Sequence, residues 1–297
     1  MDKPIIIIAG PTASGKTSLA ITLAKKFNGE IVNADSRSIY REMDIATSKP
    51  TAEERKQIPH HLVDVISPNE PFSLSDYKQL AIKAISNIHA RDKIPFFVGG
   101  TGLYLDAVVY DYSLTNVESD FTLRKKLETI DIEVLAAELK SIDPATYQSI
   151  DLNNKRRLIR AIEVSKMSKV SYISLQSKKQ KPSNMLYLVL DVPRNVLYEK
   201  INQRIDMWHD NGLIDETEKL NAKYSASLSS MSAIGYREIT EYLNHNISLI
   251  EALEIMKKRT RNYAKRQLTW FRKNPDVVYI SKSQEAVEII KTFLKLN

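Results

Sequence analysis

The sequence predicts an α/β fold in which helices cover both faces of a parallel sheet, with an all-helical domain inserted into this three-layer domain. Three observations predict it. Apolar strands alternate with amphipathic helices over residues 5–98, only helical periodicity is found over residues 113–183, and a further apolar strand follows at residues 185–190. We therefore expect a sheet domain built from residues 1–112 and 184–297, and an insertion at residues 113–183.

The elements follow in order from their apolar patterns. Residues 5–9, Ile-Ile-Ile-Ile-Ala, form the continuous apolar run of a strand buried on both faces, and Leu19, Leu23 and Phe27 recur at helical spacing. The same criteria predict strands at 30–34, 95–98 and 185–190, and helices at 17–27, 75–90, 123–130, 133–140, 155–166, 195–207, 214–221, 248–271 and 284–294. Right-handed crossovers then place the loops at the carboxyl ends of the strands on one edge, where such folds bind ligands.

Composition excludes several classes of protein. The 297 residues are 43% hydrophobic and include no cysteine, so a disulfide framework, a thiolate zinc site and a cysteine nucleophile are excluded. The longest aliphatic run, residues 5–9, is far shorter than the about 20 residues of a membrane helix, and it lacks the features of a signal peptide. We expect a cytoplasmic protein that does not associate with membranes.

Positive charge is concentrated in the later part of the chain. Residues 1–112 hold 13 Lys and Arg against 13 Asp and Glu, so the net charge of +7 comes from the remainder. Residues 152–182 contain nine basic residues and one acid, and residues 257–273 contain eight and none. This distribution is typical of a protein with a polyanionic partner, although a solvated lysine-rich surface would give the same pattern.

A phosphate-binding loop follows the first strand and opens the first helix. Its pattern, G-x-x-x-x-G-K-[ST], is formed by Gly10, Pro11, Thr12, Ala13, Ser14, Gly15, Lys16 and Thr17. Backbone N–H groups at such a helix N-terminus bind phosphate oxygens, Lys16 adds a point charge, and the Thr17 hydroxyl is a candidate ligand of Mg²⁺. The fold class is therefore the P-loop NTPase-like type.

The acid that accompanies this loop lies in an unusual place. The strand at residues 95–98 runs into Gly99-Gly100-Thr101 instead of an aspartate, whereas Asp35 follows the strand at residues 30–34. Asp35 is placed to take a proton from an acceptor nucleophile, and the alternatives are a cap for the next helix or a carboxylate that holds a metal-bound water. Thr101 lies in a glycine-rich loop that either admits a ligand or is a simple turn. The adjacent His60 and His61 have no partner at metal-ligand spacing and are interpreted as structural.

Two basic segments are candidate contacts for the polyanionic partner. Helical spacing puts Arg156 and Arg160 on one face, next to Arg157, and the alternative is a solvated helix face. In the last long helix, the basic residues Arg259, Arg261, Lys265, Arg266 and Arg272 alternate with the aromatic residues Tyr263, Trp270 and Phe271. That mixture suits phosphate neutralisation beside base stacking, unless the aromatic rings form the buried face of the helix.

Taken in order, these motifs resemble the tRNA dimethylallyltransferases (tRNA isopentenyltransferases) from about residue 5 to residue 273. The resemblance is carried by GPTASGKT (10–17), NADSR (33–37), PHHLVD (59–64), VGGTGLY (98–104), RRLIRAIEV (156–164), GLIDE (212–216), AIGYRE (233–238) and YAKRQLTWFR (263–272). The chain departs from the family pattern at Ser38, Glu42 and Ala46, which stand where Gln, Gly and Gly are expected.

The resemblance implies transfer of a dimethylallyl group from dimethylallyl diphosphate to N6 of adenosine 37, beside the anticodon of tRNA. It implies that the phosphate loop, Mg²⁺ and Arg204 hold the diphosphate, that Asp35 is the general base and that Thr101 positions the adenine amine. The implied tRNA contacts are Asp35, Ser36, Arg37, Ser38, Thr101, Arg156, Arg157, Leu158, Ile159, Arg160, Ser232, Ala233, Ile234, Gly235, Tyr236 and Arg237. We expect a monomer whose helical insertion grips the anticodon stem-loop.

Three other functions are compatible with parts of the sequence. A small-molecule kinase would have the same phosphate loop, but it would transfer the γ-phosphate of ATP and would not need a basic insertion. A prenyltransferase acting on free adenine nucleotides would not need RNA as its acceptor. An RNA-binding protein without catalytic activity would not need Asp35 beside an intact phosphate loop.

Overall fold

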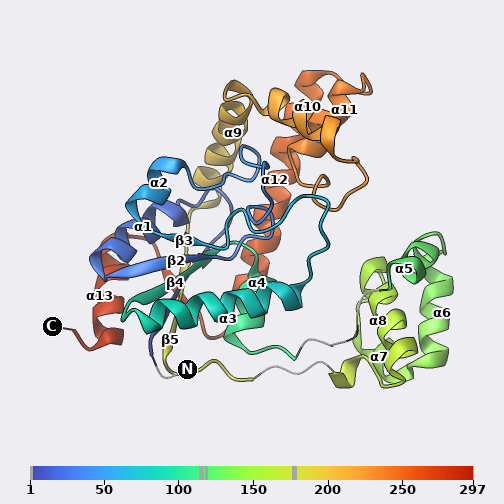
Figure 1. Ribbon diagram of the computed structural model, residues 1–297, viewed down its shortest axis with the longest axis horizontal. Coiled ribbons are helices and arrows are strands. Elements are labelled where there is room, and N and C mark those ends of the chain that lie inside the picture. The colour runs from blue at the N-terminus through green and yellow to red at the C-terminus, as the bar shows by residue number, and fades with distance from the viewer. Residues whose placement is uncertain (1–2, 114–116, 118–119, 176–178, 297) are drawn as a thin grey trace. The chain divides into compact units, whose positions relative to one another are not determined.

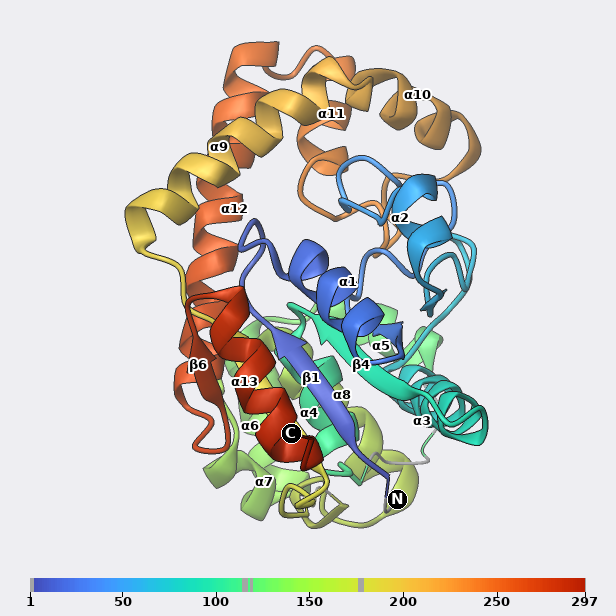
Figure 2. The same ribbon diagram turned by 90° about the vertical axis from the view of Figure 1, so that its left-hand side faces the viewer.

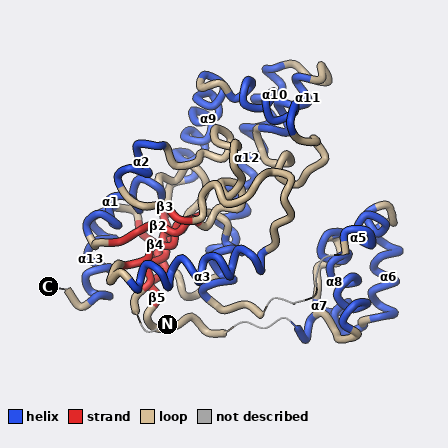
Figure 3. The backbone as a smooth tube through the Cα atoms, viewed as in Figure 1, coloured by secondary structure: helices blue, strands red, loops and turns tan. Residues whose placement is uncertain are grey.

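The structure, a computed structural model, describes residues 3–113, 117, 120–175 and 179–296. The chain divides into two compact units, Met1–Val109 with Lys181–Asn297, and Tyr110–Gln180. The second unit begins and ends three residues before the insertion expected at residues 113–183. All strands of the described chain lie in the first unit, and the described part of the second contains only helices and loops (Figure 3).

A six-stranded parallel sheet forms the centre of the first unit (Figure 1), which confirms the predicted α/β class. In spatial order its strands are β3 (His60–His61), β2 (Gly29–Asn33), β4 (Ile94–Gly99), β1 (Ile5–Ala9), β5 (Met185–Leu190) and β6 (Val278–Ile280). Ala9 pairs with Gly99, and Asn33 pairs with Val98. The carboxyl ends of β2, β4 and β1 therefore lie side by side at one edge.

Helices cover the sheet because its strands present apolar side chains to both faces. On one face, α1 (Lys16–Lys26) and α13 (Ser283–Leu294) share a buried cluster with Ile6, Ile8 and Phe96 (Figure 2). Alternate residues of a strand point to the opposite face, where α3 (Leu74–Ala90) and α4 (Gly102–Val109) complete the three layers.

A second core in this unit is built from helices that follow the sheet. It contains α9 (Arg194–Asp210), α10 (Leu213–Lys223), α11 (Tyr236–Leu243) and α12 (Leu249–Arg272). Their buried side chains pack with Ile39, Tyr40 and Met43 from the loop after β2, and with Ala13 of the phosphate loop. The segments that hold the candidate site therefore share one hydrophobic core with these helices.

The second unit is a small helical cluster with its own core. Its elements are α5 (Phe121–Glu128), α6 (Ile132–Ile142), α7 (Pro144–Ser149), α8 (Lys155–Ser168) and the 3₁₀ helix η1 (Ile173–Leu175). Leu135, Leu139 and Leu158 are among its buried residues. The Lys179 N–H donates to the Tyr110 carbonyl at 2.7 Å, so the two ends of this unit meet. Lys178 of the basic stretch at residues 152–182 lies outside the described residues.

The short elements were not predicted from the sequence. These are β3, β6, α2 (Ala52–Gln57), α4, α7, η1 and α11, whereas each predicted strand and helix is present with its ends shifted by at most three residues. In the described part of the chain, no helix is both long and apolar enough to cross a lipid bilayer.

Candidate active site

The phosphate loop joins the end of β1 to the first residue of α1. Gly15 has φ +88°, in the left-handed region that favours glycine, and the loop turns there into the helix. Ser14 Oγ is buried and finds no hydrogen-bond partner within the described chain. Because buried hydroxyls are normally satisfied, this orphaned atom at a helix N-terminus fits a loop that binds phosphate oxygens.

Two cationic side chains converge on the loop. Lys16 Nζ donates to the Pro11 carbonyl at 3.4 Å, and Arg204 of α9 donates to Thr12 Oγ1 at 3.3 Å. Burial lowers the pKa of Lys16 to about 8, the Asp35 charge opposes that shift and the Arg204 charge adds to it. Burial also lowers the pKa of Arg204. Two desolvated cations of like charge are an arrangement that a bound polyanion would stabilise.

Asp35 begins the loop that follows β2, two strands from the phosphate loop. Its Oδ1 atom accepts the backbone N–H groups of Arg37 at 2.8 Å and Ser38 at 3.4 Å. These bonds hold the turn that directly follows Asp35 and use one carboxylate oxygen. The alternative of a cap for the next helix is wrong, because α2 begins at Ala52 and is capped by Thr51. Within the described chain Oδ2 accepts no hydrogen bond, so the orientation that Oδ1 fixes leaves Oδ2 able to accept a proton.

Thr101, at the end of β4, lies beside the Asp35 loop. Its Oγ1 accepts the Ser36 N–H at 3.2 Å, and its hydroxyl is 3.4 Å from Ser36 Oγ. Its carbonyl accepts the first N–H groups of α4, so it also makes the structural turn that the sequence left open. Tyr263 of α12 lies near both groups: burial raises its pKa to about 12, Asp35 adds to this rise, and a hydrogen bond with Thr101 opposes it.

The glycines of the loop before Thr101 lie in close contact with other protein segments. A Cβ atom at Gly99 would lie 2.1 Å from the Ala34 carbonyl oxygen, and one at Gly100 would lie 2.3 Å from Gln267 Nε2. Both positions exclude a side chain because neighbouring parts of the protein pack against them. Glycine is needed here for contact between protein segments.

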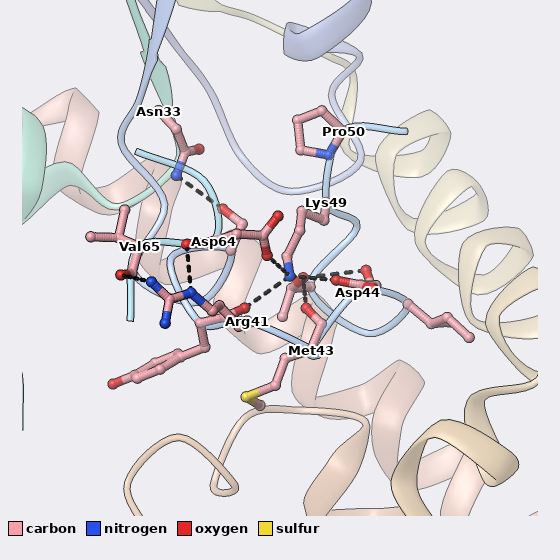
Figure 4. Close-up of polar contacts among 12 residues, drawn as sticks. Asn33, Arg41, Met43, Asp44, Lys49, Pro50, Asp64 and Val65 are labelled. Atoms are coloured by element: carbon pink, nitrogen blue, oxygen red, sulfur yellow. Dashed lines mark hydrogen bonds and ion pairs between the residues drawn. The ribbon is translucent and has the colours of Figure 1, made fainter. Parts of the chain in front are cut away.

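Hydrogen bonds and ion pairs of the buried Lys49 hold the loop at residues 36–50 in place (Figure 4). The side chain of Lys49 is 2% exposed, donates to the Tyr40 carbonyl at 2.8 Å and to Asp64 Oδ1 at 2.7 Å, and pairs with Asp44. Arg41 reaches the Asp64 and Val65 carbonyls at 3.2 and 3.0 Å. These bonds fix the loop that begins at Asp35 against the segment after β3.

The expected tRNA contacts of the first unit divide by exposure. Ser232 and Arg237 are exposed, and Ile234 is half-buried. Tyr236 is 0% exposed, its hydroxyl lies 2.5 Å from Glu216 Oε1, and Ala233 is buried. The side chains of Tyr236 and Ala233 therefore belong to the core. Ser38 is 2% exposed and its Oγ accepts from Asn33 Nδ2 at 3.0 Å, so the expectation that these three side chains lie on a contact surface is corrected.

The helical unit shows the same division. Arg156 and Arg157 of α8 are exposed, whereas Leu158 and Ile159 are core residues, so their side chains do not lie on a contact surface either. Arg160 pairs with Glu163, which is 0% exposed and also binds Arg124 at 2.8 Å. Arg160 also donates to the Val117 carbonyl at 2.9 Å, so its guanidinium is engaged within the protein.

The histidine pair is structural, as its spacing predicted. His61 Nε2 lies 2.7 Å from Glu30 Oε2, and His60 Nδ1 lies 2.9 Å from the Ile58 carbonyl. Among the described residues there is no group of three His, Asp or Glu side chains that could hold a metal ion. The expected magnesium ligand, Thr17, is half-buried in the first turn of α1.

The sequence did not identify Gln267 as a site residue, and it left open which aromatic residues of α12 are buried. Phe271 is fully buried, which is the structural alternative for these rings, and Trp270 donates from Nε1 to Asp106 at 2.8 Å. Gln267 is buried between the phosphate loop and Gly100. A single glutamine in a basic helix has no distinguishing pattern, because its partners are far away in the sequence.

A family model, curated relatives and solved structures all match this chain over most or all of its length. The model of the IPP transferase family matches residues 38–274. The chain is 42% identical to a tRNA dimethylallyltransferase of Halalkalibacterium halodurans, covering 100% of this chain and 96% of the relative, and 44% identical to one of Acetivibrio thermocellus, covering 94% and 92%. The crystal structure of a eukaryotic dimethylallyltransferase acting on tRNA superposes with a TM-score of 0.86 at 28% identity, over 99% of this chain and 80% of the other. The chain belongs to the IPP transferase family.

Proposed function

We propose that this chain is a prenyltransferase that moves a dimethylallyl group from dimethylallyl diphosphate to N6 of adenosine 37 in tRNA. The observation that carries the proposal is the meeting of the phosphate loop, Asp35 and Thr101 at the carboxyl ends of β1, β2 and β4, which are neighbours in the sheet. The names of the relatives, tRNA dimethylallyltransferases, support the same reaction.

The donor side of the site is the phosphate loop with its two cations. Lys16 and Arg204 would bind the diphosphate oxygens, and the orphaned Ser14 hydroxyl would gain a partner. Thr17 fits a Mg²⁺ ion that takes most of its ligands from water and substrate phosphate. When bound, Mg²⁺ supplies positive charge that stabilises the leaving diphosphate.

The acceptor side is the pair of loops that hold Asp35 and Thr101. In the transfer, a C–N bond forms between the adenine amine and the allylic carbon while the C–O bond to diphosphate breaks and its electron pair leaves with the oxygen. The nitrogen loses a proton, which Asp35 accepts on Oδ2 while Oδ1 stays fixed by Arg37 and Ser38. Thr101 would orient the amine through its hydroxyl. The adenine must leave the anticodon stack, which costs a few kcal/mol.

Contact with the tRNA is assigned to exposed basic residues of both units. Arg156 and Arg157 of the helical unit are proposed to bind phosphates of the anticodon stem-loop, and Arg237 and the basic face of α12 are proposed to bind beside the reacting base. One chain contains both the donor and the acceptor side of the site, so we propose that it acts as a monomer.

The test is mass analysis of nucleosides from undermodified tRNA incubated with protein, Mg²⁺ and dimethylallyl diphosphate. Asp35→Asn should lower turnover by about 100-fold or more, because a general base is lost, while the exposed matched control Asp210→Asn keeps wild-type turnover. Full activity in Asp35→Asn would remove Asp35 as the base. An arm with ATP and no prenyl donor should give no tRNA-dependent phosphate release; rapid ATP turnover without prenylation would favour a kinase.

A further inference from the structure

A single side-chain amide connects the two halves of the proposed site. Gln267 of α12 is buried, its Oε1 accepts the backbone N–H of Thr12 at 2.9 Å, and its Nε2 donates to the Gly100 carbonyl at 2.8 Å. Thr12 belongs to the loop that would hold the diphosphate, and Gly100 precedes the residue that would orient the acceptor. Both functions of the amide, acceptance and donation, are used.

The contact with Thr12 uses a group that a phosphate loop normally offers to its ligand. The backbone N–H of Thr12 donates to Gln267, and the Thr12 hydroxyl accepts from Arg204 of α9 at 3.3 Å. Thr12 is therefore fixed from two helices, one through its N–H group and one through its hydroxyl. These bonds set where the loop lies relative to α12.

The contact with Gly100 is equally specific. Any side chain there would collide with Gln267, since a Cβ atom would lie 2.3 Å from Nε2. The next residue is Thr101, whose hydroxyl accepts the Ser36 N–H beside Asp35. One turn before Gln267 on the same helix, Tyr263 lies near Thr101 and Asp35. The Gln267 amide thus joins the phosphate loop to the loop that holds the proposed orienting residue, Thr101, which in turn bonds to the residue after the proposed base.

We propose that Gln267 is a positioning residue that sets the spacing between the donor and the acceptor in the transfer reaction. This inference rests on the proposed function. Gln267 touches neither substrate; it acts through Thr12 and Gly100. In a reaction where an allylic carbon must meet an amine in line with the departing diphosphate, a displacement of about 1 Å costs about 100-fold in rate.

Two variants separate this role from simple core packing. Gln267→Met keeps the length of the side chain and loses both hydrogen bonds, whereas Gln267→Glu keeps the acceptor and, when ionised, loses the donor. A neutral glutamic acid can make both bonds, with its carbonyl accepting from Thr12 and its O–H donating to Gly100. Activity of Gln267→Glu, relative to wild type at the same pH, should therefore rise as pH falls.

The experiment measures kcat and KM for tRNA prenylation between pH 6 and 8.5, with the exposed Gln79→Glu as the matched control. Gln267→Met should lose about 10- to 100-fold in kcat with its KM for tRNA within about twofold of wild type. Gln267→Glu should recover at least threefold relative to wild type from pH 8.5 to pH 6, and Gln79→Glu should not. Should Gln267→Met fail to fold, the pH profile of the Glu variant decides alone.

Retention of kcat within about twofold by both variants, or a flat ratio of Gln267→Glu to wild type, would overturn the inference. Isothermal titration with inorganic pyrophosphate and Mg²⁺ gives a readout that needs no turnover. Gln267→Met should bind pyrophosphate at least threefold more weakly than wild type, and equal affinity would count against the inference. If the wild-type protein prenylates no tRNA, it is the proposed function that fails, and the titration still shows whether Gln267 positions the phosphate loop.

Discussion

The Thr101 hydroxyl accepts the backbone N–H of Ser36 at 3.2 Å, which ties the end of β4 to the residue that follows Asp35. The two residues are 65 apart in the sequence, and β2 and β4 are neighbours in the sheet. Thr101 therefore has two tasks in the proposed reaction: it would orient the acceptor amine, and it holds the backbone from which Asp35 projects.

Thr101→Val tests the role of the hydroxyl, because valine keeps the shape of the side chain and lacks the hydroxyl. Valine leaves the Ser36 N–H without its acceptor and removes the hydroxyl, and we expect a loss of at least about tenfold in kcat/KM from the hydrogen bond alone. Thr101→Ser keeps the hydroxyl and should stay within about threefold of wild type. Steady-state prenylation assays check both variants, and equal activity of Thr101→Val and wild type would contradict a role for the hydroxyl.

Diphosphate binding should weaken at alkaline pH because of Lys16. Its pKa is lowered to about 8, so the charged form that binds phosphate is lost as pH rises through 8. Affinity for inorganic pyrophosphate should then fall by about tenfold for each pH unit above that value. Titration calorimetry between pH 7 and 9.5 measures this decline. Lys16→Arg keeps its charge over the range, so an identical decline in that variant would show that another group titrates.

Glu30 should contribute to stability in a pH-dependent way. Burial alone would raise its pKa, but hydrogen bonds from Arg91, His61 and Lys93 lower it to about 2. A carboxyl whose folded-state pKa is depressed stabilises the fold above its unfolded value of about 4.5, and this stability is lost as pH falls toward 2. Glu30→Gln should reduce the free energy of unfolding by about 1–3 kcal/mol at pH 7. Urea denaturation at pH 7 and pH 3.5 should show the difference shrinking at the lower pH.

The arginines of α8 should differ in their effect on RNA binding. Arg156→Gln and Arg157→Gln should each weaken tRNA binding and lower the slope of log affinity against log salt by about 1. Arg160→Gln removes a partner of the buried Glu163, so it should lower the melting temperature with a smaller change in slope. Filter binding at several salt concentrations, together with thermal unfolding, distinguishes the two classes. A full unit of slope lost in Arg160→Gln would contradict its assignment as an internal ion pair.

The main elements and the proposed catalytic groups were predictable because their signals are local. The apolar run of β1, the phosphate-loop spacing and the helix after it lie within 22 consecutive residues, Ile5–Lys26. Asp35 and Thr101 were identified because each follows a strand, and the carboxyl ends of parallel strands share an edge. The contact of Thr101 with Ser36, the residue after Asp35, follows from the pairing of β2 with β4, which sequence patterns alone do not give.

The remainder depends on partners that are distant in the sequence. Gln267 bonds to a residue 255 positions away, and the burial of Tyr236 depends on Glu216 of another helix. Short strands such as β3 hold too few residues to show a period of two. Glu42, which stands where the family pattern has glycine, has φ +64°, in the left-handed region that favours glycine.

The hydrogen bond between Lys179 and Tyr110 means that the helical unit leaves and rejoins the chain at adjacent residues. A segment joined in this way can grow, shrink or be exchanged during evolution while the rest of the polypeptide keeps the same connection. The residues proposed for the chemistry, Lys16, Asp35 and Thr101, all precede Tyr110 and belong to the other unit. Sequence changes confined to the helical unit can therefore leave the residues proposed for bond formation unchanged.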